Sequence, residues 1–282
     1  MMPAFLAMRS VRLPRAFALV LAALLGACAG AGQGAAGGRE VTVLVYNIHA
    51  GTDTARQNNL ARVAELVREA GADLVLLQEV DRNTQRSGPA DQPAILARLT
   101  GYSVAFGRTI GFQGGDYGIA LLSRWPIVRD TLIPLTVTAP PGRTTEGREQ
   151  RGVLMATVAA PGGPLAVLNT HLDASGEDVW RAQEIAGVLR AAAAVEASVP
   201  VLIGGDLNAL PPSPIHQTLS GAGFRDAWRG CGTGAPETFP VNAPARRIDY
   251  LYLAGPVRCV HARVLPSYAS DHRPLLVRIR LR

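Results

Sequence analysis

Residues 200–208 of this 282-residue chain are Pro-Val-Leu-Ile-Gly-Gly-Asp-Leu-Asn, an apolar run that ends in polar side chains. The segment Val199–Gly204 is short, apolar and rich in β-branched residues, which is typical of a buried strand. Asp206 and Asn208 follow it directly. A lone Asp after a strand is more often a turn or a helix cap than a functional group. The stretch therefore becomes informative only if the same pattern recurs.

Five other predicted strands have polar side chains at an end. These are Asn47-Ile48-His49, Gln78-Glu79, Asn169-Thr170-His171, Arg247-Ile248-Asp249 and Ser270-Asp271-His272. Six such sites in one domain are hard to explain as turns and caps. If neighbouring strands end at the same edge of a sheet, the side chains converge on one cleft.

Between these sites, strand patterns alternate with a few helical patterns from residue 40 to the end of the chain. Strands are predicted at 41–48, 73–80, 102–107, 118–123, 127–137, 151–159, 165–171, 199–204, 248–253, 257–265 and 275–280, and helices at 58–70, 91–99, 177–195 and 213–219. About ten strands with three or four helices predict an α+β fold in one domain. We expect a four-layer α/β/β/α sandwich, with two mixed β-sheets packed face to face and helices outside.

The N-terminus has the pattern of an export signal. Three arginines precede an apolar run over residues 16–27, which is too short to span a bilayer comfortably. Leu25-Gly26-Ala27-Cys28 resembles a bacterial lipobox, and the alternative is an ordinary signal peptide with a chance Cys. We expect a signal peptide over 1–27, lipidation at Cys28 and a Gly/Ala-rich tether over 28–39. By the same resemblance, Ala29 in place of Asp after the Cys favours the outer membrane of a Gram-negative cell, facing the periplasm or the cell surface.

Composition limits the partners of the domain. Hydrophobic residues make up 48% of the chain, enough for a sizeable core. Without the three arginines of the first 15 residues, 25 arginines remain against 22 acidic residues, so the net charge falls from +6 to +3. This mild excess would help an anionic substrate approach but is weak evidence for nucleic acid. In an oxidising compartment, Cys231 and Cys259 either pair or stay as two separate buried thiols.

The polar residues at the strand ends indicate a type of chemistry. Glu79, Asp271 and Asn47 offer oxygen ligands that suit Mg²⁺, Mn²⁺ or Ca²⁺. An Asp–His pair can act as a general base, and a second His can stabilise charge on phosphate oxygens. The chain has no Gly-x-Ser-x-Gly elbow and no phosphate-binding Gly-x-x-x-x-Gly-Lys loop. These absences argue against a serine hydrolase and against nucleotide-driven phosphoryl transfer.

Taken in order, the motifs resemble the endonuclease/exonuclease/phosphatase superfamily, and in particular its deoxyribonuclease/sphingomyelinase-like branch. The resemblance covers about residues 41–282 and rests on Asn47, Gln78-Glu79, Asn169-Thr170-His171, Gly205-Asp206-Leu207-Asn208, Arg247-Ile248-Asp249-Tyr250 and Ser270-Asp271-His272-Arg273-Pro274.

The resemblance implies roles for single residues. It implies three metal ligands, namely Glu79, Asn47 and Asp271. Among the catalytic residues it implies Asp206 and Asn208 at the attacking water, His272 paired to Asp249 near the scissile phosphate, and His171. The implied substrate-binding residues are Arg151 and Tyr117. Ile119 stands where relatives often have Asn, which puts a polar role at that position in doubt.

The expected function is that of a metal-dependent phosphodiesterase or phosphomonoesterase that uses in-line attack of activated water. A lipid anchor would favour a lipid head group as substrate. One alternative is a secreted endo- or exonuclease acting on DNA or RNA. The other is a non-catalytic binding lipoprotein, which is disfavoured because Glu79, Asp206, Asn208 and His272 are all present. We expect a monomer.

Overall fold

The computed structural model describes residues 39–282 together with Met1. The predicted signal peptide, the lipidation site Cys28 and nearly all of the predicted tether therefore lie outside the described residues. Among the residues that are described, no helix has both the length and the apolar character needed to cross a membrane.

The described domain contains twelve strands and five α-helices in an order that matches the predicted pattern. The strands are β1 (Glu40–Asn47), β2 (Leu74–Arg82), β3 (Ser103–Phe112), β4 (Gly115–Ser123), β5 (Ile127–Leu135), β6 (Arg151–Ala160), β7 (Gly163–His171), β8 (Val201–Asp206), β9 (Arg225–Asp226), β10 (Asp249–Ala254), β11 (Val257–Val264) and β12 (Leu275–Leu281). The helices are α1 (Leu60–Glu69), α2 (Gln92–Thr100), α3 (Asp178–Ala192), α4 (Pro214–Gly221) and α5 (Ala227–Cys231).

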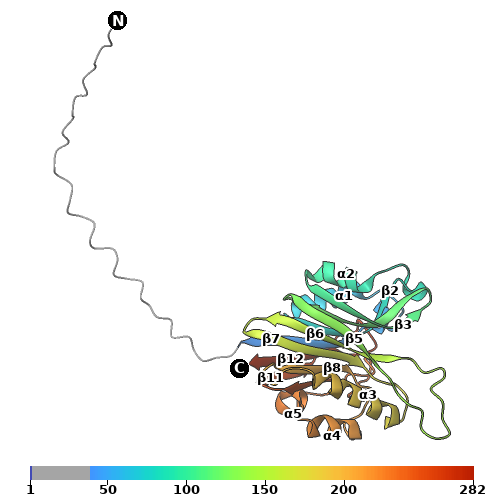
Figure 1. The fold of residues 1–282 in the computed structure, drawn as a ribbon. Helices are drawn as coiled ribbons and strands as arrows, with labels where there is room; N and C mark the ends of the chain where they lie inside the picture. The colour runs from blue at the N-terminus through green and yellow to red at the C-terminus, as the bar shows by residue number, and fades with distance from the viewer. Residues whose placement is uncertain (2–38) are drawn as a thin grey trace. The chain divides into compact units, whose positions relative to one another are not determined.

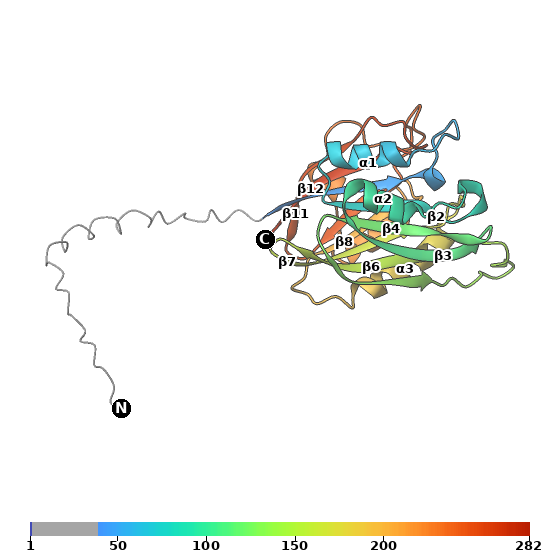
Figure 2. The same cartoon turned by 90° about the horizontal axis from the view of Figure 1, so that it is seen from above.

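The strands form two six-stranded mixed sheets. One has the order β11-β12-β1-β2-β4-β3, and the other has the order β5-β6-β7-β8-β10-β9. In Figure 1, α1 and α2 lie outside the first sheet, and α3, α4 and α5 lie outside the second. From above, Figure 2 shows α1 and α2 over the sheet that contains β2, β3 and β4. The predicted four-layer α/β/β/α sandwich is confirmed.

Three apolar cores hold the layers together, one at each contact between layers. The central core contains inward-facing residues of both sheets, such as Val43, Leu76 and Leu202. A second core joins α3 and α4 to the second sheet, and a third joins α1 and α2 to the first. Alternate residues of one strand therefore serve two different cores, which explains why β1, β2 and β8 are almost continuously apolar.

The pairing of the strands brings the predicted polar ends together. β1 runs parallel to β2, with Asn47 opposite Gln78, so both strands end at the same edge. In the other sheet β7 runs parallel to β8, with His171 opposite Asp206. β10 is antiparallel to β8, and its first residue, Asp249, is opposite Asp206. Polar side chains of both sheets thus meet at one end of the sandwich.

Two elements were not predicted, namely β9 and α5. β9 has only two residues and α5 only five, so neither is long enough to show a periodic pattern. The structure joins Cys231, at the end of α5, to Cys259 of β11 in a disulfide, with the Cα atoms 5.9 Å apart.

Candidate functional site

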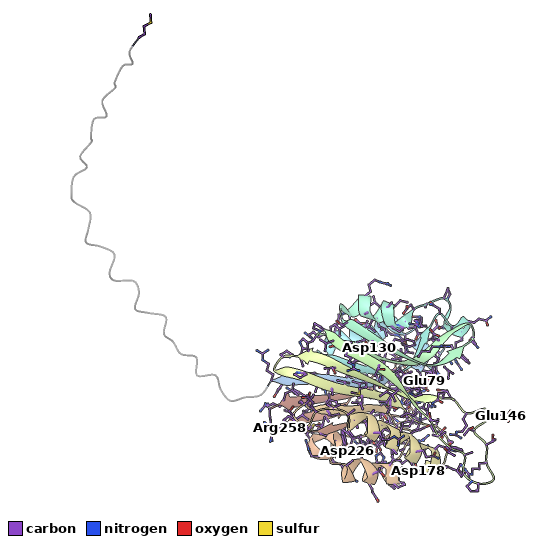
Figure 3. The ribbon with its side chains drawn as sticks, in the orientation of Figure 1. Glu79, Asp130, Glu146, Asp178, Asp226 and Arg258 are labelled. Carbon is purple, nitrogen blue, oxygen red and sulfur yellow. A yellow bond between two sulfur atoms is a disulfide. The ribbon has the colours of Figure 1, made fainter. Side chains whose placement is uncertain are left out.

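A cleft of about 490 Å³ lies where the strand ends of the two sheets meet. Glu79, Asp206, Asp271, His171 and His272 all line it. Figure 3 labels Glu79, which lies near the side of the domain that carries the loop with Glu146 and away from Arg258. The cleft therefore collects most of the residues that the sequence motifs singled out.

His272 is held between two buried carboxylates. Its Nδ1 is 2.9 Å from Asp249 Oδ2, and its Nε2 is 3.6 Å from Asp206 Oδ2. Burial alone would lower the pKa of His272, but the negative charges of Asp249 and Asp206 outweigh it and raise the pKa well above its ordinary value. His272 is therefore an imidazolium at neutral pH.

Asp206 is the carboxylate that the other groups share. Its Oδ1 accepts a hydrogen bond from the backbone N–H of Asn208 at 2.9 Å, and its Oδ2 accepts one from Asn47 Nδ2 at 3.1 Å. Burial raises the pKa of Asp206, and the negative charge of Asp249 raises it further. A carboxylate with a raised pKa is a stronger base than an ordinary one, which suits a group that takes a proton from water.

His171 has a different environment from His272, because hydrogen-bond donors lie next to both of its ring nitrogens. Arg151 NH1 is 3.3 Å from Nδ1, and Asn208 Nδ2 is 3.1 Å from Nε2. Burial lowers the pKa of His171 well below its usual value, and the positive charges of Arg151 and His272 lower it further. The ring is therefore neutral. A neutral ring has one N–H group and one acceptor nitrogen, so it can accept a hydrogen bond from only one of these two donors, and its Nε2 also lies 3.6 Å from Asp206 Oδ2.

Asn47 at the end of β1 meets Glu79, which lies inside β2. Asn47 Nδ2 donates to Glu79 Oε1 at 3.0 Å, while Asn47 Oδ1 accepts from the backbone N–H of His49 at 3.1 Å. Glu79 has a φ of 54°, and the register between β2 and β4 shifts around this residue. This bulge interrupts the strand where Glu79 enters the cleft. Since the amide of Asn47 already donates to two carboxylates, only its oxygen is left for the predicted role as a metal ligand.

Asp271 lines the cleft beside His272, and His49 lies close to it. The Asp271 Oδ1 atom accepts from Ser270 Oγ at 3.2 Å and is 4.0 Å from His49 Nδ1. Within residues 39–282, His49 Nδ1 is buried and has no hydrogen-bond partner. His49, which the sequence placed among the polar residues after the first strand without assigning it a role, therefore lies close to the site.

The donors in the cleft fit a hard divalent cation. Four carboxylates line the cleft; Glu149 pairs with Arg151, and those of Glu79, Asp206 and Asp271 offer the oxygen ligands that such a cation prefers. Ligand atoms of Asp206, Asp249 and His272 also lie within 4.8 Å of one another, so this buried group could hold a metal ion. The buried Asp249 Oδ1 atom has no partner within residues 39–282. His272 is a weaker candidate ligand, because its Nδ1 already bonds Asp249 and the ring carries a proton.

The two predicted substrate-binding residues lie in the wall of the cleft. Arg151 is buried at the start of β6 and pairs with Glu149, while its Nε atom has no partner among the described residues. Tyr117 of β4 is also buried, and the Arg86 guanidinium lies 5.1 Å from its ring centre. All the predicted catalytic and substrate-binding residues therefore lie in the cleft or, like Asp249, directly behind it.

The cleft wall also contains residues that the sequence did not identify, among them Arg86, Phe112, Phe239 and Arg246. They lie on loops, in a short 3-10 helix or at a strand end, and none belongs to a motif with fixed spacing. One signal in the sequence could have pointed to Arg246, since it directly precedes the Arg247-Ile248-Asp249 motif.

Comparisons with known proteins agree with this architecture. The model of the Endonuclease/Exonuclease/phosphatase family matches residues 44–272. The YbhP protein of Escherichia coli is 28% identical over 253 residues, which cover 85% of this chain and 96% of that protein. A solved endonuclease/exonuclease/phosphatase from Beutenbergia cavernae is 28% identical with a TM-score of 0.72, over 86% of this chain and 72% of that one.

A further solved structure, a mannosyl-6-phosphatase of Bacteroides thetaiotaomicron, is similar in fold. It is 19% identical with a TM-score of 0.71, and the match covers 85% of this chain and 99% of that one. Because the family model spans most of the residues that build both sheets and the cleft, the chain belongs to the endonuclease/exonuclease/phosphatase family.

Proposed function

We propose that the protein is a metal-dependent phosphoesterase that hydrolyses a phosphate ester by in-line attack of activated water. The observation that carries the proposal is the contact between His272, Asp249 and Asp206 in a cleft that Glu79 also lines. A buried imidazolium beside a carboxylate of raised pKa supplies both a cation for phosphoryl oxygens and a base for water.

Each residue then has a defined task. Asp206 takes the proton from the attacking water, and Asn208 helps to hold that water through its side-chain amide. His272 stabilises the negative charge on the phosphoryl oxygens, and Asp249 keeps the His272 ring charged and oriented. His171 contributes a neutral polar contact to the phosphoryl group. Glu79, with Asn47 and Asp271, would hold Mg²⁺ or Mn²⁺, which when bound neutralises phosphoryl charge.

The activity can be tested with the full chain purified in detergent. Bis-p-nitrophenyl phosphate should be hydrolysed in Mg²⁺ or Mn²⁺, and EDTA should stop the reaction. Glu79→Gln should reduce the rate at least a hundredfold, whereas Arg258→Gln, an exposed site on β11 far from Glu79, should not change it (Figure 3). Full activity of Glu79→Gln, or activity that survives EDTA, would refute the proposal.

The substrate needs a separate comparison. A panel of sphingomyelin, phosphatidylinositol phosphates, simple monoesters and plasmid DNA, each with and without metal, distinguishes a lipid phosphoesterase from a nuclease. We favour a lipid head group, since the predicted anchor would hold the enzyme at a membrane. Degradation of DNA with no turnover of the lipids would favour the nuclease instead.

We also propose that the chain is exported and anchored through a lipid on Cys28, and that the domain acts as a monomer. The support is the Leu25-Gly26-Ala27-Cys28 sequence after a basic, apolar segment. Metabolic labelling with a fatty-acid analogue should mark the wild-type chain in the membrane fraction but not Cys28→Ser. A labelled Cys28→Ser variant would contradict the anchor, and a dimer in light scattering would contradict the monomer.

A further inference from the structure

Three arginines line the cleft, and their charges are not equally compensated. Arg86 donates to both oxygens of Asp81, from Nε to Oδ2 at 2.8 Å and from NH2 to Oδ1 at 2.9 Å. This carboxylate compensates the charge of Arg86. Arg151 pairs with Glu149. In the part of the chain that the structure describes, Arg246 has no carboxylate within ion-pair distance. One cation of the cleft wall is therefore free to bind an anion from outside.

Arg246 and His272 both lie close to one aromatic side chain, Phe239. Its guanidinium lies 5.7 Å from the ring centre of Phe239, and the Phe239 ring is 4.9 Å from the His272 ring. The three side chains line the same cleft. A substrate molecule that fills the cleft therefore meets both Arg246 and His272.

The backbone around Arg246 is also held in place. Arg246 donates its N–H to Phe239 O at 2.9 Å, and its own carbonyl accepts from the N–H groups of Thr238 and Phe239 at 2.9 and 3.0 Å. The same loop is bonded to the segment that carries the proposed catalytic residues, since Val241 N–H donates to Asp271 O at 2.7 Å. These bonds hold the backbone of Arg246 in place relative to the segment that carries Asp271 and His272, while its side chain is exposed.

We propose that Arg246 binds a second anionic group of the substrate, a phosphate or a carboxylate, while the scissile phosphate lies against His171 and His272. This inference rests on the proposed phosphoesterase function and narrows its substrate class. A guanidinium suits both groups, because its N–H fork matches a carboxylate or phosphate edge. The favoured substrates are then phosphate esters with two anionic groups.

Ligand binding gives a test that does not need turnover. Calorimetry on the full chain compares α,ω-alkanediol bisphosphates of three to six carbons with the matching alkyl monophosphates, and with alkyl phosphates that end in a carboxylate. Titrations in EDTA and in Mg²⁺ show whether the preference needs the metal. At one chain length, the doubly anionic ligand should bind wild-type protein about two- to fivefold more tightly than the monophosphate, as expected for one exposed charge pair.

The variant Arg246→Gln should lose this preference, and Arg258→Gln should keep it. Arg258 is a matched control because it is exposed and lies at the other end of the domain (Figure 3). The proposal is overturned if wild-type protein binds no doubly anionic ligand more tightly than its partner, if neither binds at millimolar concentration, or if Arg246→Gln keeps the preference. Hydrolysis of bis-p-nitrophenyl phosphate reports on the proposed function separately, so the two can fail independently.

Discussion

The cleft holds two buried histidines whose surroundings give them opposite charges. His272 lies between Asp249 and Asp206, and these carboxylates raise its pKa. His171 faces Arg151 and the amide of Asn208, and burial together with the guanidinium lowers its pKa. Both side chains are almost fully inaccessible to solvent, so burial alone cannot explain the difference. The difference comes from the group that faces Nδ1, which is the Asp249 carboxylate for His272 and the Arg151 guanidinium for His171.

The two histidines would therefore act differently on the phosphate of the proposed substrate. A charged ring attracts anionic oxygens over a distance, whereas a neutral ring contributes one directed N–H group. The side of the cleft near β10 and β12 should therefore supply most of the charge stabilisation, and the side near β6 and β7 should mainly orient the substrate. Substitutions of His272, Asp249 and Arg151 test this difference between the two sides of the cleft, and the loss of activity should be largest for His272.

Replacing His272 by Ala should cause the largest loss of activity, about a thousandfold in kcat/KM, because the cation beside the phosphate disappears. Steady-state kinetics with bis-p-nitrophenyl phosphate measures it. His171→Ala should lose less, about thirtyfold, because only one neutral donor is removed. Equal losses for the two variants would contradict the proposed division.

Asp249→Asn should lower the rate about a hundredfold near pH 8 and less at pH 6. In the wild type, Asp249 raises the pKa of His272, so the ring stays protonated through the neutral range. Without that charge the pKa falls, and the ring loses its proton as the pH rises. A pH–rate profile should therefore show a new decline toward alkaline pH. A loss that does not depend on pH would mean that Asp249 only positions the ring.

Arg151→Gln should have a smaller effect, about a tenfold loss of kcat/KM. The positive charge of the guanidinium lowers the pKa of His171, so the variant ring should become easier to protonate. Nitrogen NMR of the histidine side chains should show the His171 pKa rising in the variant while that of His272 changes little. An unchanged His171 pKa would mean that Arg151 does not control the charge of the ring and has only a structural role.

Glu184→Gln tests stability instead of rate. Glu184 is buried in α3 and accepts the Asp173 N–H at 2.8 Å, and burial raises its pKa from 4.5 to about 7. A carboxyl whose pKa is higher in the folded state stabilises the fold while it is protonated, and this contribution is lost as the pH rises from about 4.5 to about 7.

The Glu184→Gln variant should therefore be more stable than wild type at pH 8, on the order of 3 kcal/mol at most, and similar to it near pH 4.5. Urea unfolding at both pH values measures the difference. Glu196→Gln, at an exposed position after α3, is the control and should show no such change. A difference that is equal at the two pH values would contradict the assignment.

The sequence predicted the layers of the fold because both sheets consist of long apolar strands with clear periodicity. It also predicted the strand-end residues, since each belongs to a short motif at the end of a recognisable strand. Pattern alone could not reveal the charge of His171, because Arg151 contacts it across 20 residues of sequence. Arg246 and Phe239 were missed for a related reason, as their positions depend on hydrogen bonds within a loop.

The loop from Phe239 to Arg246 has a consequence for how such an enzyme can diversify. His171, Asp206 and Asp249 belong to strand ends, where a shift would disturb a sheet and its cores. Arg246 instead lies on a short excursion between β9 and β10, fastened by a few main-chain bonds. A substitution at Arg246 therefore disturbs neither sheet. The proposed second anion site can change during evolution while the strand-end residues keep their positions.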